Sequence, residues 1–427
     1  MHPSRALLLV WSAALVVASA LCAVTYQVDP PGKVDPQLAA AWFAEARTLC
    51  EREGGRLWGV SLCGPMVIAD AASGTLATSQ PAPDAERPRA LGFANTALEW
   101  GGERWSTFVW SFLPRDEAQR RGRLMLHELF HRVQPELGLI TPDGDNGHLD
   151  TLEGRYWLQL EWRALAAALA SAGEARLDAL RDALAFRTVR RTAFPQAGEN
   201  ERREEIREGL AQYTGTVAST ASPAAAVEDA LEQLASAPAQ PTLLRTFAYT
   251  SGAAYGLLLD AAAPGWTRRV NAGSDLGALL AEAAGVRPAT DAAAAAARHG
   301  GAELRVAEEQ RELEHRARLA ELTARFVDGP VLRIPRGRNA SFVTTGSTAI
   351  PGHGTTLASY RVEAPWGRLE ANEVLVSSDG ETIVVPAPAR LGGGALAGEG
   401  WTLELDASWQ AEPGPREGDF RLVRVPD

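Results

Sequence analysis

Leu126-His127-Glu128-Leu129-Phe130-His131 is the segment that decides most of what the sequence implies about this chain. Its H-E-x-x-H pattern places two histidines four positions apart, so on a helix both imidazoles lie on one face and can reach one metal ion. Glu128 lies beside that face, where a carboxylate can accept a proton from a water activated by the metal. The sequence therefore predicts a zinc-binding helix that carries its own general base.

The residues around the motif are typical of a helix. No glycine or proline interrupts the segment from Arg123 to Gln134, and Pro135 follows directly. An apolar stripe at helical spacing accompanies the histidines and consists of Leu126, Leu129, Phe130 and Val133. Such a stripe can anchor the helix in a core while the histidines face a site. The alternative is a chance match in an ordinary helix.

Length and composition limit the classes of protein that need to be considered. The chain has 427 residues, of which 46% are hydrophobic and 22% charged, so we expect two or three globular domains with a sizeable core. The net charge of −11 argues against a nucleic-acid-binding protein, which would need a basic face. After the first residues, no stretch approaches the apolar length of a membrane span, so we expect no integral membrane protein.

Residues 1–20 have the features of a signal peptide. Arg5 supplies positive charge, Ala6 to Ala18 form an apolar run, and Ala18-Ser19-Ala20 fits a small-x-small cleavage site. We therefore expect a secreted or periplasmic protein, with a retained N-terminal anchor as the alternative. Apart from Cys22, just after this region, the chain has two cysteines, Cys50 and Cys63, and in an oxidising compartment they either form one disulfide or remain two buried thiols.

The rest of the chain predicts an α+β protein in three parts. Residues 24–114 form a small α/β unit, with a helix from Asp35-Pro36 and a hairpin around Gly101-Gly102. Residues 115–328 are almost all helical and hold the H-E-x-x-H motif. Gly329-Pro330 marks a boundary, after which β-branched runs and Gly/Pro-rich turns predict an all-β sandwich or barrel over residues 329–427.

Two histidines leave a catalytic zinc site incomplete, since such sites have three protein ligands and a water. The extended motif with a third histidine, H-E-x-x-H-x-x-G-x-x-H, does not continue after His131. A glutamate from a later helix is the remaining common ligand. The residues leave three candidates open: Glu153, Glu161 and Glu208.

Two later segments resemble those of gluzincin metallopeptidases, the clan of thermolysin-like and M1-aminopeptidase-like enzymes. Residues 206–213 are similar to the E-G-x-A-x-Y segment of that clan, which implies that Glu208 is the third zinc ligand. Tyr249-Thr250-Ser251-Gly252-Ala253 resembles the Y-x-K-G-A segment, which implies that Tyr249 hydrogen-bonds the oxyanion. The resemblance covers roughly Arg115 to Asp260 and implies a mainly helical, zincin-like catalytic domain.

The chain also departs from the family pattern. Seventy-six residues separate His131 from Glu208, more than is usual in the clan, whereas Glu153 has the more usual gap. Ser251 replaces the lysine of the Y-x-K-G-A segment, and no segment matches the one that holds a substrate's free amine. Aminopeptidase activity is therefore not implied.

The resulting hypothesis is a secreted zinc-dependent metallopeptidase that acts on peptides or proteins. His127, His131 and Glu208 would hold Zn²⁺, Glu128 would act as general base, and Tyr249 would assist catalysis. The alternative is a catalytically inactive, exported binding or scaffold protein on a gluzincin framework. The intact Glu128 argues against it, because a scaffold has no physical need for a carboxylate there.

Overall fold

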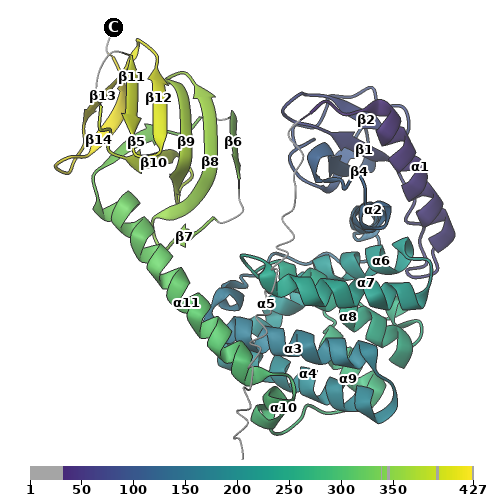
Figure 1. Ribbon diagram of the computed structural model, residues 1–427. Helices are drawn as coiled ribbons and strands as arrows, with labels where there is room; N and C mark the ends of the chain where they lie inside the picture. The colour runs from purple at the N-terminus through teal and green to yellow at the C-terminus, as the bar shows by residue number, and fades with distance from the viewer. Residues whose placement is uncertain (1–31, 338, 344–346, 391–393, 426–427) are drawn as a thin grey trace, which may run out of the picture.

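The computed structural model describes residues 32–337, 339–343, 347–390 and 394–425, so the predicted signal peptide lies outside the described residues. The fold is α+β, with a small N-terminal α/β unit, a helical middle region and a C-terminal β-rich region (Figure 1). This confirms the fold class expected from the sequence. In the described parts of the chain, no helix is both long and apolar enough to cross a membrane.

The N-terminal unit is one helix packed beside a four-stranded sheet. Helix α1 (Pro36–Glu53) begins after Asp35, whose carboxylate accepts the first free backbone N–H groups. The sheet has the order β2-β1-β4-β3, in which β1 and β4 are parallel and the outer pairs antiparallel. Its strands are β1 (Met66–Ala69), β2 (Leu76–Thr78), β3 (Thr96–Trp100) and β4 (Glu103–Val109). The β3–β4 hairpin turns at Gly101-Gly102 as predicted, and β3 lies at the edge of the sheet.

Helix α2 (Ala118–Val133) carries the H-E-x-x-H motif and lies between this sheet and helix α6 (Leu210–Ser219) (Figure 1). On the sheet side, the hydroxyl of Ser106 in β4 donates to the backbone carbonyl of Glu128. On the other side, Gly215 of α6 lies against the carbonyl of Arg123, where a Cβ atom would come within 2.5 Å of the oxygen. Both helix faces are thus fixed by close backbone contacts.

The remaining helices pack below and around α6. They are α3 (Leu152–Ala170), α4 (Gly173–Ala193), α5 (Ala197–Glu204), α7 (Pro223–Ser236), α8 (Thr246–Ala262), α9 (Leu276–Ala284) and α10 (Ala292–Arg298). One hydrophobic core continues from the N-terminal unit into this region; for example, the Trp58 and Phe130 rings lie 4.8 Å apart. The predicted boundary near residue 114 therefore does not separate two cores. Cys50 and Cys63 form a disulfide, with their Cα atoms 5.3 Å apart, between α1 and the loop before β1.

Helix α11 (Gly301–Thr323) connects the helical region to the C-terminal β module (Figure 1). The junction is held by Glu373 of the module, which accepts hydrogen bonds from Arg318 at 2.7 Å and Arg325 at 3.3 Å. The strands are β5 (Val331–Pro335), β6 (Asn339–Val343), β7 (Ala349–Ile350), β8 (Gly354–Ala364), β9 (Gly367–Ser377), β10 (Thr382–Pro386), β11 (Ala395–Gly398), β12 (Trp401–Leu405), β13 (Trp409–Pro413) and β14 (Phe420–Arg424).

These strands form one hydrogen-bonded sheet that folds around its own core. Strand β9 pairs with β8 along one edge, and along its other edge with β12 near Leu369 and β10 near Leu375. The sheet therefore branches at β9 into one part that continues with β12 and another that continues with β10. A separate hydrophobic core between these two parts includes Trp366, Val385 and Leu403. The module has the all-β character predicted for residues 329–427.

Candidate metal centre

Three predicted ligands meet at one point. On α2, the Nε2 atoms of His127 and His131 lie 3.0 Å apart, as the four-residue spacing predicts. The Oε2 atom of Glu208 lies 3.3 Å from each of these nitrogens. In the described parts of the chain, these three side chains are the group whose ligand atoms lie close enough together to hold a metal ion. His127 and Glu208 are buried, and His131 is partly exposed.

Glu208 reaches the histidines through one turn of π-helix, η3 (Glu205–Gly209), between α5 and α6. Such turns insert an extra residue and often occur at functional sites. The side-chain amide of Gln134, just after α2, donates to the backbone carbonyls of Ile206 at 3.2 Å and Arg207 at 2.8 Å. These bonds tie the turn that carries Glu208 to the end of the histidine helix.

The other two glutamate candidates are engaged elsewhere. Glu153 is exposed at the start of α3 and forms an ion pair with Arg305 at 2.6 Å. Glu161 is fully buried, where it accepts hydrogen bonds from Arg190 at 2.5 Å and the hydroxyl of Tyr255 at 2.7 Å. Tyr255 is therefore a packing residue of the helical core.

Two glutamines orient the imidazoles. The Nδ1 atom of His131 lies 2.7 Å from Oε1 of Gln134, and Nδ1 of His127 lies 3.2 Å from Oε1 of Gln212. Because an amide oxygen only accepts, each histidine donates through Nδ1 and keeps Nε2 free for a ligand. Neither glutamine can be identified from the sequence, since neither belongs to the H-E-x-x-H motif.

The donor atoms fit a zinc ion. Two imidazole nitrogens and one carboxylate oxygen are a common catalytic set for this metal. Oε2 of Glu128 is buried and has no hydrogen-bond partner among the described residues. Oε2 of Glu208 is also buried, with the two imidazole nitrogens 3.3 Å away. Leaving such an oxygen unpaired is costly, and a bound cation or water removes that cost.

The local charges favour a cation at this point. Burial opposes protonation of His131, but its hydrogen bond to Glu208 and the carboxylate of Glu128 raise its pKa to about 9. Burial alone would raise the pKa of Glu208, yet hydrogen bonds from both histidines outweigh it and lower that pKa. For Glu128, burial is the larger effect and raises the pKa, although the histidines act in the opposite direction. The site thus attracts positive charge, which in the metal-free protein is a proton.

Tyr249 of α8 lies against the histidine pair. Its ring stacks on the imidazole of His127, with the ring centres 5.3 Å apart and an angle of 7° between their planes. Burial and the carboxylate of Glu208 raise the pKa of the Tyr249 hydroxyl. The hydroxyl therefore remains protonated at neutral pH and can donate a hydrogen bond.

A cavity of about 320 Å³ opens beside these residues. Its walls come from the edge strand β3 and the residue before it, from β4, from α2, from the loop after α2, from η3 and from the start of α8. The lining residues are Asn95, Thr96, Ala97, Arg104, Glu128, His131, Gln134, Ile140, Thr141, Arg207, Glu208, Arg245 and Tyr249. The candidate ligands His131 and Glu208 thus share one accessible space with Glu128 and Tyr249.

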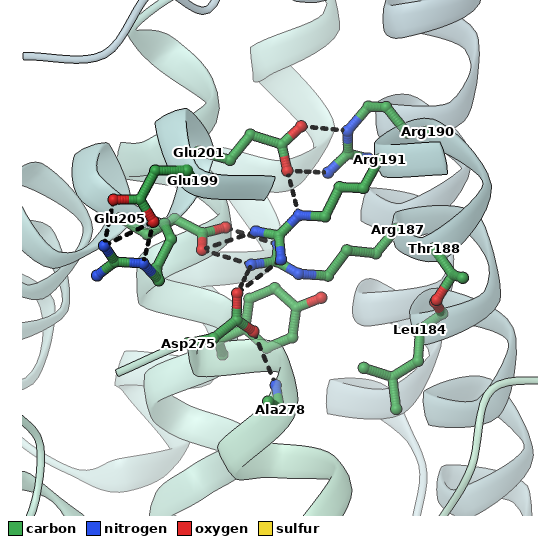
Figure 2. A network of polar contacts seen from close by, with 12 residues as sticks. Leu184, Arg187, Thr188, Arg190, Arg191, Glu199, Glu201, Glu205, Asp275 and Ala278 are labelled. Atoms are coloured by element: carbon green, nitrogen blue, oxygen red, sulfur yellow. Dashed lines mark hydrogen bonds and ion pairs between the residues drawn. The ribbon is translucent and has the colours of Figure 1, made fainter. Parts of the chain in front are cut away.

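Behind η3 lies a buried network of charged residues (Figure 2). Arg187 of α4 makes two hydrogen bonds to the carboxylate of Glu205, at 2.7 and 2.5 Å, and one to Asp275 at 3.2 Å. Arg190 makes a similar pair of bonds to Glu201 at 2.7 and 3.0 Å. Burial opposes the charge of Arg187, but Glu205 and Asp275 outweigh it and raise its pKa. The network therefore anchors both α5 and the turn that carries Glu208.

His148 belongs to this network. Its Nε2 atom lies 2.9 Å from Oε1 of Glu201, and its ring packs near Phe194. His148 thus has a structural partner, and it is not among the residues that line the cavity beside the histidine pair.

Comparison of the chain with protein-family models, with curated proteins and with solved structures finds no match.

Proposed function

We propose that this chain is an exported zinc-dependent metallopeptidase. The observation that carries the proposal is the convergence of His127, His131 and Glu208 on one point, with the buried carboxylate of Glu128 lining the same cavity. The proposed export rests on the sequence of residues 1–20 alone.

His127, His131 and Glu208 would hold the zinc ion, and the two glutamines behind the histidines keep the coordinating nitrogens turned inward. When bound, zinc supplies Lewis acidity that acidifies a water molecule and polarises a carbonyl group. Glu128 takes up the proton of the attacking water and then passes it to the amine that leaves. Its raised pKa suits both steps, because a carboxylate with a very low pKa would return the proton poorly.

Tyr249 completes the reaction site. Since its hydroxyl remains protonated, it donates a hydrogen bond to the oxygen that becomes negative as the carbonyl is attacked. The free edge of β3 lines the same cavity, and an extended peptide can form backbone hydrogen bonds with such an edge. Ile140, whose surface is 57% exposed, adds an apolar wall for a neighbouring side chain.

The decisive experiment compares Glu128→Gln with the parent protein. Zinc content is measured by mass spectrometry, and hydrolysis is followed with a library of quenched fluorescent peptides. We expect about one zinc per chain in both proteins and at least a hundredfold slower hydrolysis in the variant, as is typical for loss of a general base. His127→Ala should lose both the zinc and the activity.

The scaffold alternative predicts different results. A scaffold protein would contain zinc without hydrolysing any peptide, or would contain no zinc that depends on His127. Equal hydrolysis rates for the parent and Glu128→Gln would contradict the proposed mechanism.

A further inference from the structure

The cavity beside the metal centre is lined by three arginines, Arg104, Arg207 and Arg245, which come from three different elements. The positive charge of Arg207 is neutralised by two carboxylates: it donates to Glu204 at 2.6 Å and forms an ion pair with Asp143. Arg104 and Arg245 are not neutralised to the same degree.

Arg245 precedes α8 and is the most exposed of the three, at 70% of its side-chain surface. Its contacts with carboxylates are long, 3.5 Å to Oε1 of Glu208 and 3.9 Å to Oε1 of Glu204. An arginine has five N–H donors in a planar fork, so most donors of Arg245 remain free to bind a ligand in the cavity.

Arg104 projects from β4. Its ion pair is with Glu99 at 3.5 Å, and the Glu99 side chain is 64% exposed, so water screens the attraction. The Nε–H group of Arg104 is buried and has no hydrogen-bond partner among the described residues. A buried donor without a partner favours a ligand that can accept from it.

The charge balance indicates what that ligand is. With a divalent ion on His127, His131 and Glu208, the carboxylates of Glu128 and Glu208 offset the charge of the metal. Among the residues that line the cavity the balance is then positive, because the carboxylates of Glu99, Glu204 and Asp143 that pair with the arginines are not part of the lining. A guanidinium matches a carboxylate in shape and binds it through two parallel hydrogen bonds.

We propose that Arg104 and Arg245 select peptides that carry a carboxylate near the scissile bond. The carboxylate can belong to an aspartate or glutamate side chain or to the C-terminus of the peptide. This inference rests on the proposed function for the identity of the ligand as a peptide. It goes further by naming the residues that choose among peptides and the chemistry that they recognise.

Binding is tested with the zinc-loaded Glu128→Gln protein, whose slow turnover keeps the peptide intact. Fluorescence anisotropy measures the Kd of matched peptides that differ in glutamate against glutamine at each position, and in a free against an amidated C-terminus. We expect about tenfold tighter binding of the carboxylate member of one pair, since a charge-assisted hydrogen bond contributes about that much. A preference within a glutamate–glutamine pair identifies a side-chain carboxylate as the group that is recognised, and a preference within a free–amidated pair identifies the C-terminal carboxylate. The preference should weaken at high salt.

Adding Arg245→Gln or Arg104→Gln to that protein should bring the ratio of the two Kd values close to one. Each variant is compared through its own ratio, so a general loss of affinity does not affect the result. Arg269→Gln is the matched control, because Arg269 is also exposed and lines none of the cavity walls, and it should keep the parent ratio.

Equal binding of both members of every pair would overturn the inference, while hydrolysis of neutral peptides by the parent would still support the proposed function. A carboxylate preference that persists in both arginine variants would also overturn it. If the preference depends on the arginines but the zinc-loaded parent hydrolyses no peptide, carboxylate recognition stands and the proposed function fails.

Discussion

Gly252 of α8 touches Gly209 of η3 with no side chain between them, because a Cβ atom on Gly252 would overlap the Cα atom of Gly209. Gly209 directly follows the proposed ligand Glu208, and Gly252 lies three residues after Tyr249. The contact between the two backbones therefore sets the position of the carboxylate of Glu208 relative to the ring of Tyr249. These glycines lie in the two segments that resemble gluzincin motifs.

Gly252→Ala should separate α8 from the turn that carries Glu208. The added methyl group meets backbone atoms, which cannot rotate away as a flexible side chain could. We expect a loss of about 1–3 kcal/mol in the free energy of unfolding and a weaker affinity for zinc. Urea unfolding and competition with a chelator measure the two effects.

Gly198→Ala is the matched control for this substitution. Gly198 lies in the first turn of α5, and its added Cβ atom would meet only the side chain of Arg191 at 3.8 Å, an ordinary contact. Alanine is the better helix former, so this variant should gain up to about 1 kcal/mol. If the two variants behaved alike, the proposed importance of the Gly209–Gly252 contact would be wrong.

Gln134→Leu tests the orientation of His131. The change removes the acceptor for Nδ1 of His131 and also the two bonds that tie Gln134 to the backbone before Glu208. Loss of such an outer hydrogen bond typically weakens metal binding by about 10–100-fold, and we expect a change of that size in the Kd for zinc. Gln310→Leu on the exposed face of α11 should leave this Kd unchanged; a similar effect there would point to a general loss of stability.

The sequence predicts the parts of the site that depend on local geometry. His127 and His131 lie four residues apart on one helix, so helical geometry alone brings their Nε2 atoms together. Glu208 lies far along the chain, and only its resemblance to a family segment favours it over Glu153 and Glu161. Its approach depends on the packing of α6 against α2 and on one π-helical turn, neither of which has a local pattern that the sequence shows.

The same distinction applies to the rest of the fold. The hairpin at Gly101-Gly102 and the change to strands after Gly329 follow from turn residues and alternation, and both are present. The sequence does not predict strand β8, because alternation is confined to its second half, around Tyr360 and Val362, and the first half consists mainly of polar and small residues. Its pairing with β9 forms it instead. Gln134 and Gln212, which accept hydrogen bonds from the Nδ1 atoms of the two histidines, could not be predicted either, because these contacts form only in the folded structure.

Arg187→Met tests whether the buried charge network supports the proposed ligand turn. Methionine has a similar length but leaves the carboxylate of Glu205 buried without its main partner. Breaking a buried ion pair in this way typically costs about 3–5 kcal/mol, and the displaced turn should also bind zinc more weakly. Arg316→Met is the control, since its pair with Glu312 lies on the surface and should contribute less than about 1 kcal/mol.

A second variant keeps this prediction testable if Arg187→Met does not fold. Replacing both partners, in Arg187→Met with Glu205→Leu, removes the unpaired charge and should recover much of the stability. Urea unfolding at pH 7 measures all of these proteins. A single variant as stable as the parent would show that the network does not hold η3 in place.

Zinc binding should depend steeply on pH because it displaces a proton from His131. In the metal-free protein, burial lowers the pKa of His131, but the carboxylates of Glu208 and Glu128 outweigh burial and raise that pKa from an ordinary value of 6.5 to about 9. A histidine binds metal only when neutral, so below pH 9 the apparent affinity should fall about tenfold for each unit of pH. Chelator competition measures this slope, and proton release in a weakly buffered solution measures the displaced proton.

The same raised pKa fixes the sign of a stability effect in the metal-free protein. The contribution of protonated His131 is present in full below pH 6.5 and is lost as the pH rises through about 9. Between these values the Tm of the metal-free protein should therefore fall, whereas the Tm at a saturating zinc concentration should stay nearly constant, because His131 is neutral in both the zinc-bound and the unfolded protein there. In Glu208→Gln, which lacks the nearest carboxylate, the fall should move to lower pH. If the Tm of the metal-free parent protein does not change over this window and zinc binding releases no proton, His131 is already neutral and zinc meets no competing proton.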